Sequence, residues 1–293
     1  MRHPWLGGAA AILAGSAALA QAPASGPPLR VIAFGAHPDD CDQKAGGTAA
    51  KWAALGAQVK FVSVTNGDAG HQTEGGGALA KRRRAEAAEA GRRFGIAEYD
   101  TLDNHDGQLI PSVDVREQVI RKIRQWKADV VVAPRPNDYH PDHRYTGVLI
   151  QDAAYMVVVP NIAPDTPPLR KNPVFLYFQD GFQRPNPFRP DVAVAIDDVL
   201  DKKIHALDAH TSQMYEWLPW VAGNLEEVPK DPAARVEWLR KSRSGGPLSD
   251  AVKEAVRKRY GAKADAVRNV EAFELCEYGR RPAEDELSRL FPF

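Results

Sequence analysis

Residues 30–40 read Arg-Val-Ile-Ala-Phe-Gly-Ala-His-Pro-Asp-Asp, a short apolar run that ends in a cluster of polar, metal-capable side chains. A nearly continuous apolar run of this length is typical of a strand buried on both faces of a parallel sheet. The turn that follows lacks the Gly-x-Gly-x-x-Gly pattern of a dinucleotide site, which disfavours a nucleotide-binding module. The stretch therefore predicts a parallel α/β sheet with a functional loop after its first strand.

The rest of the chain continues an alternation of strands and helices. Apolar or β-branched runs predict strands, and apolar residues at helical spacing predict helices between them. The predicted strands are 58–65, 99–102, 129–133, 174–178 and 192–196, and the predicted helices are 48–55, 78–94, 113–127 and 142–158. This pattern indicates a Rossmann-like α/β fold with a mostly parallel sheet flanked by helices. From about residue 197 the pattern is mainly helical, which predicts a helical C-terminal extension.

The N-terminus differs from the rest of the chain. Residues 6–20 carry no charge, follow a charged start and end in Ala18-Leu19-Ala20, which is the pattern of a signal peptide and its cleavage site. The run is shorter than the ~20 residues that a membrane span needs, which disfavours an anchor. We expect a signal peptide over residues 1–20, a linker over 21–28, an α/β domain over 29–215 and the extension over 216–293. The mature protein is expected in the periplasm or outside the cell, without stable membrane insertion.

Composition narrows the class of partner. Lys plus Arg and Asp plus Glu both number 38, so no basic excess attracts nucleic acid. Apolar residues make up 44% of the chain, enough for a large core. Cys41 and Cys276 are the two cysteines and do not make a disulfide framework. The expected partner is a small molecule, and the sequence leaves the oligomeric state open.

Two groups of polar side chains follow predicted strands. The groups are His37, Asp39 and Asp40, and His140, Asp142 and His143. Ligands of parallel sheets bind at the carboxyl ends of strands, so the groups would face each other if their strands are neighbours. Each group alone is compatible with helix caps or turns. Two groups at matched strand ends favour an active site.

The spacing within these groups suits a metal. Catalytic zinc takes three protein ligands and keeps one open position. His37 and Asp40 are spaced i, i+3 and would share a face at the start of a helix, and a histidine of the second group would complete the set. Asp39 then remains beside the metal as a free carboxylate, as a general base requires. Such ligands suit zinc and also other divalent ions such as Fe²⁺.

Taken together, residues 36–40 and 140–143 resemble the motifs of the PIG-L/LmbE-type family of N-acetylglucosaminyl deacetylases. Weaker matches follow in order over about residues 30–215. They are residues 46–48, 65–70, Arg83 with Glu86, 106–109, Lys203 with Ala206, and His210 with Ser212 and Gln213, with a further echo at 271–273. The resemblance implies a zinc-dependent hydrolase that removes an N-acyl group, usually acetyl, from a glucosamine-type sugar or sugar conjugate.

The resemblance also assigns roles by position. It implies zinc ligands at His37, Asp40 and His143, a general base at Asp39, an oxyanion-stabilising residue at His140 and its orienting partner at Asp142. It further implies substrate contacts by Arg83, Asp106 and Tyr139. The chain departs from the family pattern at Cys41, where members often carry Glu, and at Tyr139, which adjoins the second motif instead of preceding it by two residues.

Two rival functions use the same residues. One is a metal-dependent amidase that acts on a non-sugar N-acyl substrate. The other is a metal-dependent carbohydrate-binding protein without turnover, which Asp39 disfavours because binding alone needs no spare base. The aromatic residues Tyr215, Trp217 and Trp220 have two interpretations, stacking on a sugar or packing a helix against the core.

Overall fold

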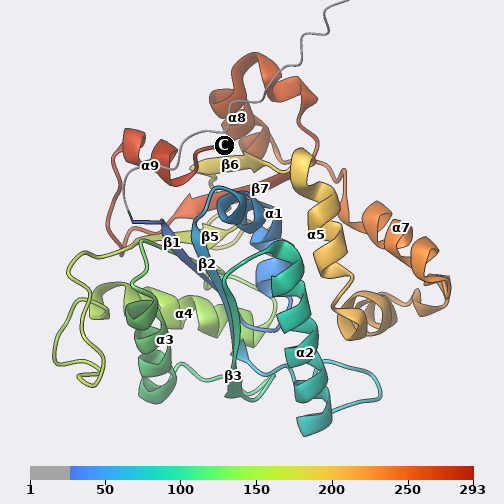
Figure 1. Ribbon diagram of the computed structural model, residues 1–293, viewed down its shortest axis with the longest axis horizontal. Coiled ribbons are helices and arrows are strands. Elements are labelled where there is room, and N and C mark those ends of the chain that lie inside the picture. Colours follow the sequence, from blue (N-terminus) through green and yellow to red (C-terminus); the bar gives the residue numbers. More distant parts are fainter. Residues whose placement is uncertain (1–26) are drawn as a thin grey trace, which may run out of the picture.

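The computed structural model describes residues 27–293, so the predicted signal peptide and most of the predicted linker lie outside the described residues. Within this range one seven-stranded sheet carries helices on both faces (Figure 1). The strands are β1 (Arg30–Gly35), β2 (Gln58–Thr65), β3 (Glu98–Asn104), β4 (Val130–Ala133), β5 (Val174–Phe178), β6 (Val192–Ala195) and β7 (Val270–Leu275). The α-helices are α1 (Asp40–Ala54), α2 (Gly76–Phe94), α3 (Val113–Trp126), α4 (Pro141–Met156), α5 (Leu200–Leu207), α6 (Leu218–Ala222), α7 (Pro232–Arg243), α8 (Asp250–Tyr260) and α9 (Glu284–Leu290).

The strand order in the sheet is β3-β2-β1-β4-β5-β7-β6. The first five of these strands are parallel, and β7 is antiparallel to both of its neighbours. The predicted Rossmann-like, mostly parallel sheet is therefore confirmed. β1 lies between β2 and β4, so the chain winds away from β1 in both directions. A topological switch point of this kind is where α/β sheets bind ligands.

The C-terminal segment, which we predicted as mainly helical, also contains a strand that the sequence analysis did not predict. Strand β7 lies inside the sheet, between β5 and β6, and its Ala272 and Phe273 are fully buried. The sequence of β7 is Val-Glu-Ala-Phe-Glu-Leu. Because Glu, Ala and Leu favour helices, helix propensity predicts a helix here and not a strand. The partner strands override that preference, because they supply both hydrogen bonds and apolar neighbours.

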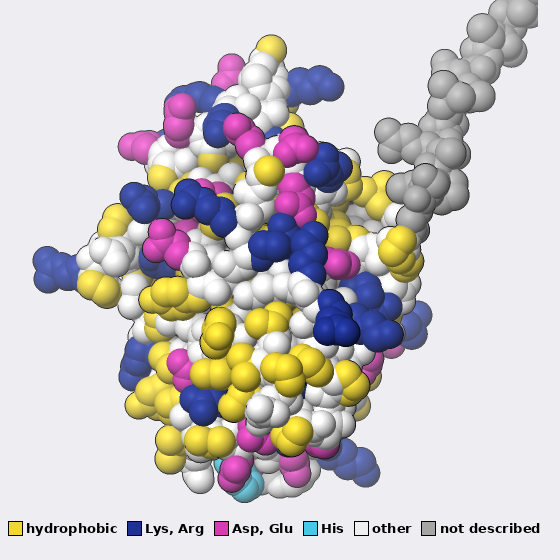
Figure 2. Space-filling view, turned by 90° about the vertical axis from the view of Figure 1, so that its left-hand side faces the viewer, with side chains coloured by type: hydrophobic (Ala, Val, Ile, Leu, Met, Phe, Trp, Pro, Cys, Tyr) yellow, Lys and Arg dark blue, Asp and Glu magenta, His cyan; other side chains and the backbone are white. Residues whose placement is uncertain are grey.

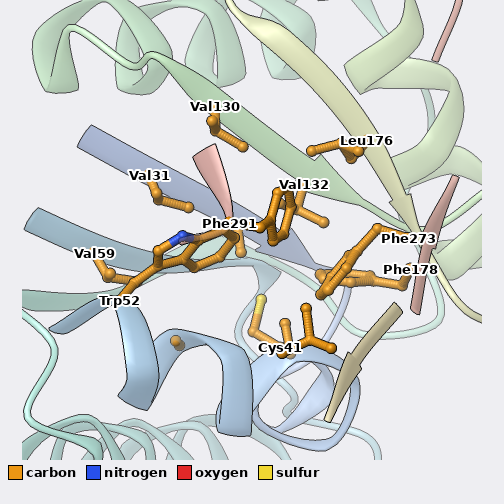
Figure 3. Close-up of a cluster of buried hydrophobic side chains, with 14 of the residues drawn as sticks. Val31, Cys41, Trp52, Val59, Val130, Val132, Leu176, Phe178, Phe273 and Phe291 are labelled. Atoms are coloured by element: carbon orange, nitrogen blue, oxygen red, sulfur yellow. The ribbon is translucent and has the colours of Figure 1, made fainter. Parts of the chain in front are cut away.

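One hydrophobic core lies between the sheet and helices α1, α2 and α5 (Figure 3). Trp52 of α1 is its largest fully buried side chain, and its indole N–H donates to Leu290 O at 2.7 Å. The rings of Trp52 and Phe291 lie 4.9 Å apart. The last residues of the chain therefore complete the core of the α/β domain.

A second core covers the other face of the sheet, under α3 and α4. The hydroxyl of Ser112 accepts a hydrogen bond from Val115 N and caps the start of α3, as the sequence pattern suggests. Val119, Ile120 and Ile123 follow at helical spacing and are fully buried. The two cores fix β1 and β4 side by side, which sets the loops that follow these strands.

None of the helices between residues 27 and 293 combines the length and the apolar character that a bilayer span requires. On the face seen in Figure 2, acidic and basic side chains are interspersed in the upper part, and hydrophobic side chains gather in the lower part.

Candidate active site

The two predicted groups of polar side chains meet at one edge of the sheet. β1 and β4 pair in parallel, so the loops after them emerge next to each other at their carboxyl ends. The first group continues into the start of α1, and the second continues into the start of α4. A third loop, which follows β3, brings Asp106 to the same place. Asp106 Oδ1 lies 3.0 Å from His37 Nε2.

The three side chains that we predicted as metal ligands lie close together. His37 Nδ1 lies 3.2 Å from His143 Nε2 and 3.6 Å from Asp40 Oδ2, and His143 Nε2 lies 3.5 Å from Asp40 Oδ2. A tetrahedral zinc site with bonds of about 2.0–2.2 Å has ligand atoms roughly 3.3–3.6 Å apart. The three atoms therefore have the spacing of three corners of such a tetrahedron.

The charge around His37 also suits a cation. Burial would lower the pKa of His37, but the carboxylates of Asp106, Asp142 and Asp40 outweigh burial and raise that pKa well above the ordinary value. Burial likewise would raise the pKa of Asp40, but His143 and His37 lower it far below the ordinary range. Several carboxylates crowd a nearly buried imidazole, and a divalent ion would offset their charge.

Two other trios share His37. His37, His140 and His143 each offer a ring nitrogen within 4.8 Å of the others, and so do His37, Asp106 and Asp142 with their ligand atoms. The trio that contains Asp40 has the spacing that best suits a metal ion, because all three of its distances lie between 3.2 and 3.6 Å. In this arrangement the Nδ1 atom of His37 faces Asp40 and His143, and its Nε2 atom faces the carboxylates of Asp106 and Asp142.

Carboxylates lie next to the outer nitrogens of both histidines. His143 Nδ1 lies 2.9 Å from Asp138 Oδ1, a hydrogen bond that leaves Nε2 as the ligand atom. His37 Nε2 lies 3.0 Å from Asp106 Oδ1, although this pair is not aligned as a hydrogen bond. Carboxylate–histidine pairs of this kind orient metal ligands and raise their basicity.

Asp39 has a strained backbone and a fixed carboxylate. Its φ of 143° lies in the region that favours glycine, which costs about 1–3 kcal/mol and is characteristic of functional sites. Asp39 Oδ1 accepts from Arg83 Nη2 at 3.0 Å, and Oδ2 accepts from Gln43 Nε2 at 2.8 Å. Its side chain does not cap α1, so the interpretation of Asp39 as a simple helix cap does not hold. Burial raises the pKa of Asp39, and Arg83 opposes that shift.

His140 is held as a neutral imidazole with a defined proton position. Its Nδ1 accepts from the backbone N–H of Asp142 at 3.2 Å, so the ring proton lies on Nε2. Burial and the neighbouring His37 lower the pKa of His140. The contact between His140 and Asp142, its expected orienting partner, is thus made by the backbone of Asp142. The carboxylate of Asp142 accepts from Gly107 N at 2.7 Å and from Leu109 N at 3.3 Å.

The three predicted substrate-contacting residues have different environments. Tyr139 is 74% exposed, and its ring lies 5.5 Å from that of His143, at the mouth of the site. Asp106 and Arg83 are buried, and their side chains are 3.5 Å apart. Arg83 also donates to Pro38 O and Gly67 O, so its guanidinium braces the loops around Asp39. Contacts of these residues with a sugar remain a prediction.

The weaker motif matches form buried supports beneath the site. Glu271 of β7 accepts from Gly47 N at 2.8 Å and Thr48 N at 2.7 Å, and it also pairs with Lys203 Nζ at 2.7 Å. These contacts connect α1, α5 and β7.

A second support lies on α2, where Glu86 accepts from Ser212 Oγ at 2.6 Å and from Ser212 N at 3.0 Å. A third joins fully buried His210 to Asp42 at 2.9 Å. Ser212 is therefore engaged with Glu86, which argues against a nucleophile at that position.

The sequence interpretation missed Asp138. It lies in an Asn-Asp-Tyr turn, where an aspartate is usually a turn residue. In the sequence, only its position five residues before His143 pointed to a role for Asp138. A spacing of five residues is not one that places two side chains together on a helix. Cys41 is buried and free, as expected for a small thiol, and burial raises its pKa well above the ordinary value.

Comparisons with known proteins identify relatives of this chain. Residues 32–154 match the family model described as PIG-L: GlcNAc-PI de-N-acetylase. The chain is 31% identical over 204 residues to a diacetylchitobiose deacetylase of Thermococcus kodakarensis, which covers 65% of this chain and 73% of that relative. A solved structure of N,N′-diacetylchitobiose deacetylase from Pyrococcus horikoshii has a TM-score of 0.63 and 25% identity, over 87% of this chain and 88% of that one.

The same fold also occurs in a protein with different chemistry. A 4-carboxy-2-hydroxymuconate hydratase from Pseudomonas putida has a TM-score of 0.64 over 87% of this chain and 99% of that one, at 19% identity. This likeness concerns the fold alone. Function must therefore be argued from the residues of the site.

Proposed function

Because this chain belongs to the PIG-L family, we propose that it is a metal-dependent hydrolase that removes the acetyl group from the nitrogen of a glucosamine-type sugar or sugar conjugate. The observation that carries the proposal is the convergence of His37, Asp40 and His143 with Asp39 beside them. The relatives named as deacetylases of diacetylchitobiose support the choice of an N-acetylated sugar.

The proposed cofactor is Zn²⁺, held by His37 Nδ1, Asp40 Oδ2 and His143 Nε2. Two imidazoles and one carboxylate form a ligand set used by catalytic zinc, and Fe²⁺ is compatible with the same donors. When bound, a divalent ion of this kind polarises the acyl oxygen and acidifies a water molecule in the open position.

Asp39 is proposed to move the proton. Asp39 is separated from His37 by Pro38 alone and is followed directly by Asp40. Arg83 and Gln43 each donate to one of its carboxylate oxygens. A general base must be positioned before its pKa matters, and the raised pKa of Asp39 then favours proton uptake. Asp39 would take the proton from the attacking water and deliver it to the leaving amine.

His140 is proposed to stabilise the negative charge that develops on the acyl oxygen. Its Nδ1 is occupied by Asp142 N, so Nε2–H remains to donate a hydrogen bond. Preorganised donors of this kind typically contribute about 10²–10³-fold to the rate. Tyr139 at the mouth, and Asp106 deeper in the site, are proposed to contact the sugar.

The first rival, an amidase with a non-sugar substrate, would use the same catalytic residues. Acetate release from a panel of N-acetylated sugars and matched N-acetylated non-sugar amines separates the two. Our proposal predicts faster release from the sugars. Equal or faster release from the non-sugar amides would favour the rival.

The second rival, a binding protein without turnover, differs in the role of Asp39. If the chain only bound sugars, the metal-loaded protein would bind them without releasing acetate, and Asp39→Asn would change nothing that an acetate assay detects. Acetate release that depends on Asp39 would exclude this rival.

Location is a separate proposal. We infer export from the charged start, the apolar run and the Ala-Leu-Ala end of residues 1–20. A sugar deacetylase outside the cytoplasm would meet its substrate in the periplasm or outside the cell.

A further inference from the structure

We propose that Trp217 and Trp220 form a stacking platform for a second sugar ring. This ring is the one joined to the ring that undergoes deacetylation. The inference rests on the proposed function, because it assumes a sugar at the metal site. It extends that function by assigning a second subsite to residues outside the catalytic motifs.

The two indoles form a parallel pair at the surface, in which Trp217 is half-buried and Trp220 is exposed. Trp217 ends a π-helical turn (Ser212–Trp217) and Trp220 follows in α6, so their spacing of three residues puts them on one side of a continuous helix. The rings are stacked with centroids 5.3 Å apart and an angle of 16° between their planes. Trp220 is 50% exposed and the adjoining Val221 is 60% exposed. An exposed apolar patch of this kind marks a binding surface more often than an isolated apolar residue does.

The pair lies next to the catalytic site. A Cβ placed on Gly70 would lie 3.2 Å from Asp106 Oδ2 and 3.8 Å from Trp217 Nε1, so Gly70 lies close to both side chains. Asp106 in turn lies 3.0 Å from His37 Nε2. The path from the metal ligands to the indoles thus crosses one carboxylate and one glycine. Because Asp106 is proposed to contact the sugar, we infer that the ring joined to that sugar would lie near the indoles.

Hydrogen bonds fix this surface against the loop that carries Gly70. Gln213 Nε2 donates to Gly70 O at 3.0 Å, and His71 Nε2 lies 2.9 Å from Glu216 Oε2. Arg82 also binds Glu216, through Nη1 at 2.9 Å. Two contacts therefore connect the π-helical turn to the loop. Single π-helical turns within helices occur often at functional sites. A surface held in this way loses little entropy when it binds a ligand.

The chemistry of the platform favours a pyranose. One face of a pyranose presents C–H groups, which pack on the electron-rich face of an indole, while its rim of hydroxyls stays in water. Tyr215, the third aromatic of this segment, is 4% exposed and donates to Asp208, so it packs the segment against the protein. The two interpretations of the aromatic cluster thus apply to different members of it.

The test compares a mono- with a disaccharide in binding, not in turnover. Dissociation constants of N-acetylglucosamine and its β-1,4-linked disaccharide are measured by calorimetry on the metal-loaded protein, with Asp39→Asn in every variant to suppress turnover. We expect Trp220→Ala to weaken disaccharide binding about 2- to 12-fold, as for an aromatic stack of about 0.5–1.5 kcal/mol, and to leave monosaccharide binding unchanged.

Two further variants separate stacking from a structural effect. Trp220→Tyr keeps a flat ring and should restore most of the preference for the disaccharide. Tyr155→Ala removes an aromatic side chain that is 66% exposed near the far end of α4, and should change neither constant.

The outcomes also separate this inference from the proposed function. The platform is refuted if Trp220→Ala leaves the disaccharide preference intact, if it weakens both sugars equally, or if neither sugar binds. If disaccharide binding depends on Trp220 while the Asp39-containing enzyme releases no acetate, the platform stands and the proposed function falls.

Discussion

Replacing Asp138 tests how the structure holds its proposed metal ligand His143. Asp138 Oδ1 lies 2.9 Å from His143 Nδ1 and also accepts from His140 N at 3.0 Å. Burial would raise the pKa of Asp138, but the contact with His143 outweighs it and lowers that pKa. An ionised carboxylate here keeps the proton of His143 on Nδ1 and points Nε2 at the metal. We expect Asp138→Ala to weaken metal binding.

The expected size follows from the kind of hydrogen bond. A hydrogen bond to a charged group contributes about 1.5–3 kcal/mol, which corresponds to roughly 10- to 150-fold in affinity. Loss of outer-shell partners of metal-bound histidines typically costs about 10- to 100-fold. Asp138→Asn keeps a neutral acceptor worth about 0.5–1.5 kcal/mol, so its loss should be smaller, about 5- to 10-fold.

The assay is a competition titration of Zn²⁺ between the protein and a chromophoric chelator, with thermal unfolding as a check on folding. Asp152→Ala is the matched control, because Asp152 lies on α4 and is 42% exposed by its side chain in a surface pair with Arg116. It should leave metal affinity unchanged.

Three results would refute the reasoning. They are Asp138→Ala binding metal as tightly as the unmodified protein, Asp138→Asn losing more affinity than Asp138→Ala, and the control losing as much as either variant. In each case the carboxylate would not be orienting a metal ligand.

Three other predictions follow, two from the structure and one from the sequence. Asp39→Asn should lower kcat about 10²–10⁴-fold with near-normal metal content, whereas Asp40→Asn should first lower metal affinity; equal metal loss in both variants would contradict the assigned roles. Glu271→Gln should lower the free energy of unfolding by about 3 kcal/mol or more, since it leaves Lys203 buried without its charge partner, and an unchanged Tm would contradict this support. N-terminal sequencing of the natively expressed protein should begin near Gln21 in an exported fraction, and an intact Met1 in the cytoplasm would refute export.

The fold was largely predictable because each strand of the parallel part has a local signal. Apolar runs such as residues 30–35 and 130–133 are buried on both faces, so they need no alternation to be recognised. β7 was not predictable from its local pattern, because the partners of its buried Glu271 lie in distant parts of the sequence. Glu271 binds Gly47, Thr48 and Lys203, and none of these is near it in sequence.

The site was predictable where a motif and a strand end coincide. The structure brings His37, Asp40 and His143 together because β1 and β4 are neighbours. The surroundings were less predictable, because they depend on long-range contacts. Arg83 has the position of a sugar-binding residue in the family pattern, yet here it is buried against Asp39. The spacing of 44 residues between Asp39 and Arg83 in the sequence does not predict that their side chains are in contact.

The central claim is that a metal ion held by His37, Asp40 and His143 enables the chain to hydrolyse an N-acetyl group. The most direct measurement is acetate release from an N-acetylated glucosamine substrate while Zn²⁺ or Fe²⁺ is titrated into chelator-treated protein, in parallel with His143→Ala. We predict almost no acetate before metal is added, activity that saturates near one ion per chain, and no recovery in His143→Ala at the same metal concentration. Full activity in the metal-free protein, or no acetate at any metal concentration, would contradict the claim.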